Sequence, residues 1–266
     1  MKRIFKVLFI IVLFGFIFMS AIACNKKDSD LKKVTDNKVI YVGITIYDPM
    51  DYFAEDGETI IGFDADLANM FADNLGIKAK FVPICWDSKV LELNGGYIDV
   101  IWNGMTKTEE LAKNIDFSLA YATNFQCVVK KASTVIDKVE DLNGKKVAVE
   151  QGSAGDTTVT SLNLNPNRVG SQLDALNEVL AGTSDACVID YTMAYSLVGK
   201  GSYEALEIVS AEKIAFDQEV FAVGFRKNSD LIKKLDDFFK ECYNNGKLNE
   251  LALKYGVAIN ETEFKK

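Results

Sequence analysis

The sequence predicts an α/β fold of two lobes, with two strands crossing between them and a ligand cleft in the middle. Three observations support this prediction. Two successive segments show the same order of strand, helix, strand, helix and strand, with polar residues at the strand ends. An order of apolar helix, glycine, aspartate and apolar strand occurs at 91–101 and again at 173–189. A strand at 220–226 then precedes the closing helices, so the chain crosses between the lobes twice and can form a hinge.

The first residues have the pattern of a secretory signal. Three basic residues come before an apolar run at 7–19. This run is shorter than the ~20 apolar residues that a membrane-spanning helix needs. We therefore expect a signal peptide over residues 1–23.

Small residues lead from the apolar run into Cys24, as in the lipobox of bacterial lipoproteins, although leucine is usual at the place of Ala21. We expect a lipid on Cys24, with simple cleavage as the alternative. A diacylated cysteine would anchor the protein outside the cytoplasm to the cell membrane. The polar stretch 24–37 shows no apolar period and is expected to be a flexible, lipid-anchored tether.

Composition excludes several functions. Removal of the signal takes away three positive charges and no negative ones, so the net charge changes from -8 to -11, which does not suit a nucleic-acid partner. The chain has no histidine, so it lacks the commonest general base and metal ligand. We expect no metal site and no cofactor.

The cysteines after Cys24 are too widely spaced for the paired pattern of a zinc site. Disulfides are possible outside the cytoplasm, but three of the four cysteines lie in apolar strand-like runs where a buried free thiol fits equally well. Both alternatives stay open for Cys85, Cys127, Cys187 and Cys242.

The first lobe is expected over 38–123 and 222–266. A strand rich in β-branched residues covers 38–46, and residues 59–63 form the second strand of a hairpin that leads into a helix closed by Gly76. The next strand covers 78–83 and delivers the chain to Trp86. Two aspartates in the helix, Asp64 and Asp66, do not complete a calcium loop, and we expect them to be capping and first-turn charges.

The stretch 86–118 is the centre of the predicted site. An apolar run at 98–102 is short enough to be a buried strand, and it ends on Asn103, Gly104 and Thr106. Open α/β sheets bind their ligands just beyond the carboxyl ends of their strands. The alternative is a plain strand-to-helix turn in which Thr108 caps the helix.

The second lobe is expected over 124–221, which includes the hinge strands. A strand at 145–149 ends on the loop 150–155, which contains Ser153 and offers free backbone N–H groups to an anion such as a carboxylate. The loop has no Walker ending, so nucleotide binding is not predicted. A later apolar strand ends on Asp190, whose carboxylate could pair with an ammonium group.

The helices after the second crossing are expected to pack on the first lobe. Ser229 is predicted to cap a helix with one apolar face, which ends near 244–246, and a shorter helix follows over 248–255.

Several motifs together resemble the polar amino-acid-binding proteins of ABC importers, the extracellular solute-binding proteins of family 3. They are GFDADLA (62–68), GGYIDVIWNGMTKTEE (95–110), DLNGKKVAVEQGSAG (141–155), SDACVIDY (184–191) and EVFAVGFRKNSD (219–230), in an order that spans nearly all of the mature chain. The resemblance implies a periplasmic-binding-protein-like fold. It also implies a monomer that binds a small-molecule solute by lobe closure and delivers it to ABC permease subunits.

The same resemblance implies roles for individual residues. Two aromatic side chains would sandwich the solute, three residues of the Asn-Gly-x-Thr motif and one serine of the second lobe would hold its carboxylate, and one aspartate would take its α-ammonium. The aromatic pair is Tyr47 and Trp86. The residues for the carboxylate are Asn103, Gly104 and Thr106 of the motif and Ser153 of the second lobe, and the aspartate is Asp190.

One departure affects the expected solute. The family usually has a carboxylate-binding arginine where this chain has Leu111. Lys107 and Lys113 are near in sequence, but neither restores the planar fork of a guanidinium. The solute is thus either a polar amino acid held by Ser153 and the following helix, or an amine without a carboxylate.

An enzyme on the same fold, similar to secreted dehydratases, is the alternative function. It would need a carboxylate in the cleft as general acid or base, and Glu150 is the candidate. We expect no catalytic residue, and turnover of a candidate solute distinguishes the two functions.

Overall fold

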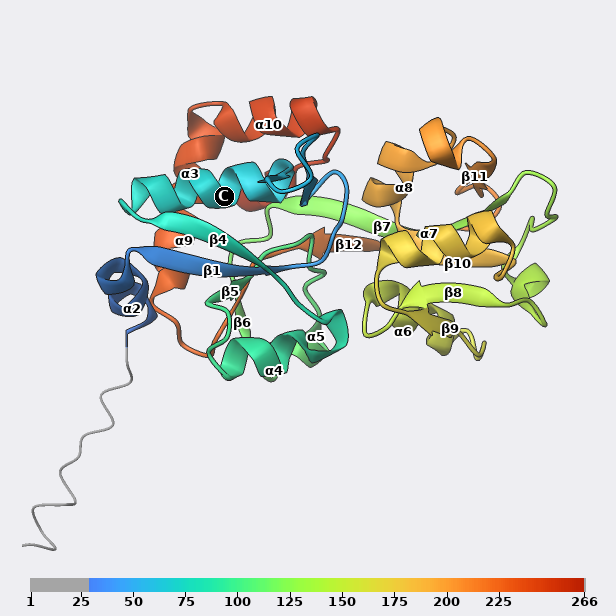
Figure 1. The fold of residues 1–266 in the computed structure, drawn as a ribbon, viewed down its shortest axis with the longest axis horizontal. Helices are drawn as coiled ribbons and strands as arrows, with labels where there is room; N and C mark the ends of the chain where they lie inside the picture. Colours follow the sequence, from blue (N-terminus) through green and yellow to red (C-terminus); the bar gives the residue numbers. More distant parts are fainter. Residues whose placement is uncertain (1–28, 266) are drawn as a thin grey trace, which may run out of the picture.

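The computed structural model describes residues 29–265 and consists of two lobes side by side, joined by two strands (Figure 1). Each lobe has a central sheet with helices on its faces, which confirms the predicted two-lobe α/β fold. The predicted signal peptide (1–23) and Cys24 lie outside the described residues. In the part of the chain from 29 to 265, no helix is long and apolar enough to cross a membrane.

The first sheet has the strand order β4-β1-β5-β13-β6. Strand β1 pairs in parallel with β4 and with β5, whereas β13 pairs antiparallel with β5 and β6. The strands are β1 (Val39–Ile44), β4 (Lys78–Pro83), β5 (Val100–Ile101), β6 (Asp116–Phe117) and β13 (Gly224–Phe225). A separate hairpin of β2 (Tyr52–Phe53) and β3 (Ile60–Ile61) precedes the first long helix, as predicted.

The second sheet has the order β11-β7-β10-β8-β9, and β12 also pairs with β7. Strands β8 and β10 are parallel, while β7 runs antiparallel to β10. Every residue of β8 and β10 is buried, including the carboxylates on which they end, Glu150 and Asp190. The strands are β7 (Ala122–Lys131), β8 (Val147–Glu150), β9 (Asn167–Val169), β10 (Ala186–Asp190), β11 (Leu206–Ile208) and β12 (Gln218–Phe221).

Strands β7 and β12 connect the lobes (Figure 1). The sequence predicted a single strand over 220–226 that crosses back to the first lobe, but the structure has two strands there. Strand β12 ends at Phe221, and β13 begins at Gly224, because the chain changes partner there from β7 to the first sheet. The expected lobe boundaries at 123/124 and 221/222 fall within β7 and at the end of β12.

Helices cover the first sheet much as the apolar periods predict. Helix α3 (Phe63–Asn74) ends before Gly76, where φ is +68°. Helices α9 (Leu231–Asn244) and α10 (Lys247–Tyr255) pack on this lobe, where Phe239 of α9 meets Trp102 edge-on at 5.6 Å between ring centroids. The smaller helices of this lobe are α4 (Lys89–Asn94), α5 (Glu109–Ala112) and α11 (Glu261–Phe264). The second lobe has α6 (Ala154–Ser161), α7 (Gln172–Ala181) and α8 (Tyr191–Leu197).

The predicted tether 24–37 is wrong for residues 29–37. Residues Asp30–Asn37 form helix α2, in which Ser29 is the N-cap and Val34 is buried. The helix is held by distant partners, because Asp230 accepts a hydrogen bond from Leu31 N (2.9 Å). These long-range contacts leave no trace in a local apolar period, so sequence reasoning missed them.

The prediction that Ser229 caps α9 was also wrong. The helix begins at Leu231, so Asp230 occupies the N-cap position, and its carboxylate is directed to α2 instead of capping its own helix.

Parallel strands place their carboxyl ends at one edge of each sheet. In the first lobe β1, β4 and β5 end at one edge, and in the second lobe β8 and β10 do so. Residues that follow these strands, among them Tyr47, Trp86 and Ser153, line one cavity between the lobes. The topology thus brings together residues far apart in the chain.

Candidate functional site

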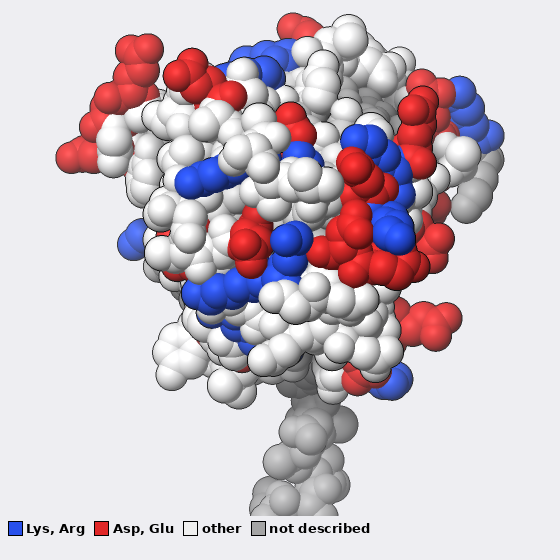
Figure 2. Space-filling view, turned by 90° about the vertical axis from the view of Figure 1, so that its right-hand side faces the viewer, with Lys and Arg blue, Asp and Glu red and all other residues white. Residues whose placement is uncertain are grey.

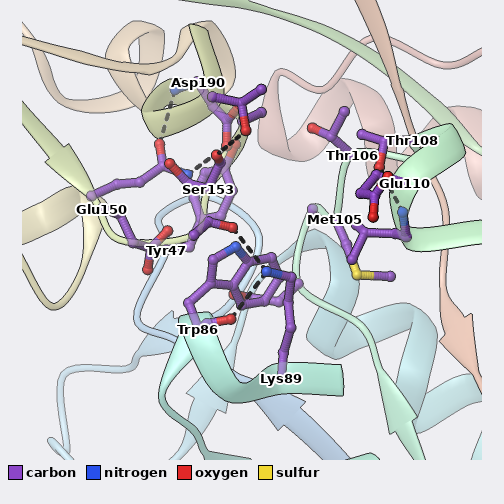
Figure 3. A pocket seen from close by; sticks show the side chains of 17 residues that line it. Tyr47, Trp86, Lys89, Met105, Thr106, Thr108, Glu110, Glu150, Ser153 and Asp190 are labelled. Atoms are coloured by element: carbon purple, nitrogen blue, oxygen red, sulfur yellow. Dashed lines mark hydrogen bonds between the residues drawn. The ribbon is translucent and has the colours of Figure 1, made fainter. Parts of the chain in front are cut away.

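A cavity of about 210 Å³ lies between the lobes and is lined by both of them (Figure 3). All seven residues predicted for ligand binding line it. The first lobe contributes Tyr47, Trp86, Lys89, Asn103, Gly104, Met105, Thr106, Thr108, Glu110 and Leu111, and the second contributes Glu150, Gly152, Ser153, Ala154, Thr157, Gln172 and Asp190. This volume is below the roughly 300–1,000 Å³ of drug-sized sites, so it suits a small solute.

Two aromatic side chains form part of the wall. Trp86 begins a single 3₁₀ turn after β4 and is 7% exposed. Tyr47 follows β1 and is buried, and no described residue completes a well-formed hydrogen bond to its hydroxyl. Burial and then the negative charge of Asp190 raise the Tyr47 pKa well above its usual range, so this phenol stays neutral. A stacking surface therefore lies beside a carboxylate.

Asn103 lines the cavity, but the backbone of the first lobe already uses its amide. Its Nδ2 donates to Thr45 O (2.9 Å) and Asp51 Oδ2 (2.7 Å), and its Oδ1 accepts from Thr45 N (3.0 Å). The side chain thus fixes the end of β1, from which Tyr47 extends. In this arrangement Asn103 positions the aromatic wall rather than presenting a free amide.

Gly104 is required by close packing against the tyrosine. Its φ is +55°, and a Cβ atom there would lie 2.8 Å from Tyr47 Cε1. Its N–H donates to Asp64 Oδ2 (2.7 Å), so this donor is occupied. A left-handed conformation and a 2.8 Å contact both exclude a larger residue.

Asp64 and Asp66 lie in the first turn of α3, as expected, but Asp64 does not cap the helix. It is fully buried, accepts from the Tyr121 hydroxyl (2.8 Å) and supports the Gly104 turn from behind. Burial raises its pKa to about 7. Asp51, also buried, has its pKa raised by burial and then by the charge of Asp64. In the sequence, the buried pair of Asp51 and Asp64 is visible only as acidic residues near the start of an apolar helix. Acidic residues in an exposed first turn have the same pattern, so the sequence did not reveal their burial.

Asp190 ends β10 and is 4% exposed. Three side-chain amides donate to its carboxylate, from Asn124 (2.7 Å), Gln126 (2.6 Å) and Gln172 (2.6 Å). Burial and then the charge of Glu219 raise its pKa to about 6. It occupies the N-cap position of α8 without a side-chain capping bond, so helix capping does not explain its presence.

Thr106 is linked to the same polar network. Its hydroxyl donates to Glu219 Oε2 (3.0 Å) on β12, and Glu219 also accepts from Gln126 Nε2 (3.0 Å) on β7. The network connects the first lobe to Asp190 through both crossing strands. Sequence reasoning missed Glu219 and Gln126 because each stood alone in a strand-like run.

Ser153 and Glu150 form the second-lobe side of the cavity (Figure 3). Ser153 is the N-cap of α6 and accepts from Asp156 N (3.1 Å). Glu150 is buried at the end of β8, and its Oε1 has no hydrogen-bond partner in the described part of the chain. Burial and then the charge of Asp190 raise its pKa to about 8, so it is mainly protonated at neutral pH.

Leu111 lines the cavity where the resemblance implies an arginine, but a lysine that sequence reasoning did not consider lies there as well. Lys89 is 5% exposed, and it is the one basic side chain among the cavity-lining residues given above. Lys107 instead lies over the Phe117 ring, 5.8 Å from its centroid, and Lys113 pairs with Glu110 on α5.

Three contacts hold the lobes together around the cavity. Lys89 Nζ donates to Gly152 O (2.9 Å), and Gln151 Nε2 donates to Asp87 Oδ2 (2.9 Å). On the other side the Ser196 hydroxyl donates to Asp48 Oδ1 (2.5 Å). A cleft bridged in this way is in a closed arrangement.

The cysteines of the described region take no part in the site. Cys85 is exposed, and the other three are buried. All four are free thiols in this structure: Cys85, Cys127, Cys187 and Cys242.

Charged side chains on the outer end of the second lobe are of both signs. Figure 2 shows acidic and basic residues interspersed on this face rather than gathered into one basic area. Nucleic-acid-binding proteins use a continuous basic patch or stripe.

The chain is similar in sequence and in structure to known binding proteins. It is 28% identical over 244 residues to the arginine-binding extracellular protein ArtP of Bacillus subtilis, covering 88% of this chain and 91% of that protein. A histidine-bound substrate-binding protein of an ABC uptake transporter from Streptococcus pneumoniae has a similar structure, with a TM-score of 0.79 and 31% identity, over 86% of this chain and 97% of that one.

The ancestral amino acid-binding protein AncCDT-1, a precursor of cyclohexadienyl dehydratase, is similar as well. Its TM-score is 0.78 at 29% identity, over 85% of this chain and 99% of that one. The family model for bacterial extracellular solute-binding proteins, family 3, matches residues 40–258. The chain therefore belongs to the bacterial extracellular solute-binding proteins of family 3.

Proposed function

We propose that this protein binds a polar amino acid or a related amine-bearing solute between its lobes and delivers it to the permease subunits of an ABC importer. The observation that carries the proposal is Asp190, a buried carboxylate at the cavity that faces the aromatic wall of the opposite lobe. An ammonium group is the partner such a carboxylate prefers, and an aromatic face also attracts a cation.

Lobe closure follows from where these groups lie. Trp86 and Thr106 belong to the first lobe, and Asp190 and Ser153 belong to the second. A solute that touches both sets binds the closed arrangement more tightly than the open one, so it shifts the population toward closure. One binding site per chain and no need for a second copy fit a monomer.

The test begins with the solute that co-purifies. Native mass spectrometry of the purified protein should show a bound small molecule, and the same molecule should be released by denaturation. Calorimetric titration of the stripped protein should then give one site per chain, and small-angle scattering should show compaction on binding. Absence of any bound solute, together with no compaction by amino acids or amines, would refute the proposal.

The lipid anchor is part of the same proposal and rests on the residues before Cys24. An anchored protein should partition into detergent from cells, and Cys24→Ser should release it. Cys85→Ser is the matched control, because Cys85 is an exposed free thiol elsewhere in the chain. Equal membrane association of both variants argues against lipidation.

A second candidate function, catalysis, rests on Glu150. A buried carboxyl group whose pKa is raised to about 8 and whose Oε1 has no partner in the described region could act as a general acid at the cavity. Similarity to AncCDT-1, a dehydratase precursor, gives this candidate its reaction class. Incubation of the protein with the co-purified solute, followed by NMR, decides: an unchanged solute over many hours refutes catalysis, whereas turnover lost in Glu150→Gln supports it.

A further inference from the structure

Lys89 is a buried cation at the cavity without a charged partner. It is the first residue of α4, directly after the 3₁₀ turn that carries Trp86. The side chain is 5% exposed, and no ion pair within 4 Å involves it among residues 29–265. A buried charge that is not paired is costly, so its presence calls for a partner.

The hydrogen bonds of Lys89 leave one donor unused. An ammonium group has three N–H donors. Nζ donates to Trp86 O (3.0 Å) and to Gly152 O (2.9 Å), which are both neutral carbonyl groups. It also lies 4.8 Å from the centroid of the Trp86 ring. Two carbonyls and an aromatic face orient the ammonium of Lys89, which lines the cavity (Figure 3), and its third N–H has no acceptor among the described residues.

The nearest acidic groups do not complete the site. The Glu150 carboxyl lies beyond ion-pair distance, and burial holds it mainly protonated at neutral pH with a pKa of about 8. Asp87 is bonded to Gln151 Nε2 (2.9 Å) on the second lobe. The Asp190 carboxylate accepts its three amide hydrogen bonds from β7 and α7, and no ion pair within 4 Å joins it to Lys89 in the described part of the chain. The missing counter-charge is therefore external to the chain.

We propose that Lys89 binds the carboxylate of the solute and makes the site prefer an amino acid over the corresponding amine. This inference rests on the proposed function of a solute-binding protein. Lys89 on α4 supplies the positive charge that the family's arginine would supply at the position of Leu111 on α5. An α-amino acid then bridges two opposite charges, its carboxylate at Lys89 and its ammonium at Asp190. The zwitterion matches a cavity that is lined by the buried cation of Lys89 and the buried carboxylate of Asp190.

Matched ligand pairs that differ only in the carboxylate test the proposal. The pairs are L-arginine with agmatine, L-histidine with histamine and L-lysine with cadaverine, to which the co-purified solute is added once identified. Calorimetric titration of the wild type should show that the amino acid of a binding pair binds at least about 30-fold more tightly than its amine, the lower end of the range for a buried charge pair.

Substitution of the lysine gives the decisive comparison. Lys89→Met keeps the length of the side chain but removes the charge. We expect the amino acid to bind about 30-fold or more weakly, while the amine binds equally well or better because a repelling cation is gone. A merely structural lysine, acting through its bond to Gly152, would weaken both members of a pair by the same factor.

Two further variants are controls. Lys107→Met removes an exposed lysine that does not line the cavity and should change neither affinity. Leu111→Arg, combined with Lys89→Met, places a guanidinium at the cavity-lining position where the resemblance implies one, and it should restore the preference for the amino acid.

The outcomes separate the two proposals. Wild-type binding with the same amino-acid preference in Lys89→Met refutes the role of Lys89 and leaves the solute-binding function intact. A wild type that binds the amine as tightly as the amino acid, or a co-purified solute without a carboxylate, also overturns it. If no probe and no co-purified solute binds, the proposed function fails, and the role of Lys89 fails with it.

Discussion

Asp190→Asn is the substitution that isolates the ionic part of solute binding. It keeps the size and shape of the side chain and removes its charge. Because Asp190 is buried at the cavity and is not used as a helix cap, its charge has no evident purpose in the empty protein. Burial raises its pKa to about 6, so the carboxylate is still mainly ionised at pH 7, and a bound cation stabilises that charge further.

The expected magnitude follows from the desolvated setting. Loss of one partner of a buried, hydrogen-bonded charge pair costs roughly 2 to 5 kcal/mol. At about 1.4 kcal/mol per factor of ten, the Kd should rise at least about 30-fold. The apo protein should keep its melting temperature at pH 7 within a few degrees. In the variant one amide donor of Asn124, Gln126 or Gln172 loses its acceptor, which costs about 1–3 kcal/mol. The variant also no longer has to bury a charge, and this gain offsets that cost.

Affinity should also depend on pH in a defined direction. Below pH 6 Asp190 becomes protonated in the empty protein, so a cationic solute has to displace a proton. The Kd of the wild type for a cationic solute should therefore rise roughly tenfold from pH 5.5 to pH 4.5, and Asp190→Asn should lose this dependence.

The assay is calorimetric titration of the co-purified solute into the stripped wild type and variant, with thermal unfolding of both apo proteins. Asp185→Asn is the matched control, because this exposed aspartate precedes the same strand and accepts only from Lys146 N at the sheet edge. Wild-type affinity in Asp190→Asn would falsify the ionic role. A large drop in apo stability with proportionate loss of binding would instead indicate a structural residue.

Three other predictions follow from the same geometry. Trp86→Ala should weaken binding several-fold to tens-fold, because about 0.5 to 2 kcal/mol of stacking is lost, and it should change the stability of the apo protein little. The control Trp102→Ala, in the core beside Phe239, should instead lower the unfolding free energy by about 3–5 kcal/mol. Calorimetry measures the affinities and denaturant titration the stabilities, and the reverse pattern would contradict the assignment. Gly104→Ala should lower affinity at least tenfold by displacing Tyr47, which lies 2.8 Å from the added Cβ, and wild-type binding in this variant would mean that the turn relaxes. Stability should fall from pH 5 to pH 8, because burial raises the folded pKa of Asp64 to about 7. Its contribution is full below the unfolded pKa near 4 and is lost as the pH rises to 7, by about 4 kcal/mol in all, of which about 3 kcal/mol is lost above pH 5. Asp64→Asn should make the melting-temperature profile less steep, since Asp51, Glu150 and Asp190 also have raised pKa values, and a wild-type profile that rises over this range contradicts the reasoning.

The sequence by itself determined the architecture and seven of the seventeen residues that line the cavity. Period-2 and period-3.6 apolar patterns are local, so they locate strands and helices without knowledge of the fold. Parallel strands put their carboxyl ends at one edge, which is why residues as distant as Tyr47, Asn103 and Asp190 could be expected in one site.

The same local patterns were silent about contacts made at long range. Residues Asp30–Asn37 include only two apolar residues, Leu31 and Val34, yet they form a helix whose first turn is bonded by Asp230 and Arg226, nearly 200 residues later. Asp64 resembled a surface capping residue, although the fold buries it behind Gly104. In each case the deciding partner lies far along the chain.

Only the tertiary structure decided which polar groups are free for a solute. Asn103 and the Gly104 N–H were expected to hold a carboxylate, but the first lobe engages both, through Thr45 and Asp64. Lys89 looked like an ordinary helical lysine, and closure of the second lobe over it buries its ammonium against Gly152. Burial and hydrogen-bond saturation depend on the three-dimensional neighbours of a group, and a sequence pattern specifies only its neighbours along the chain.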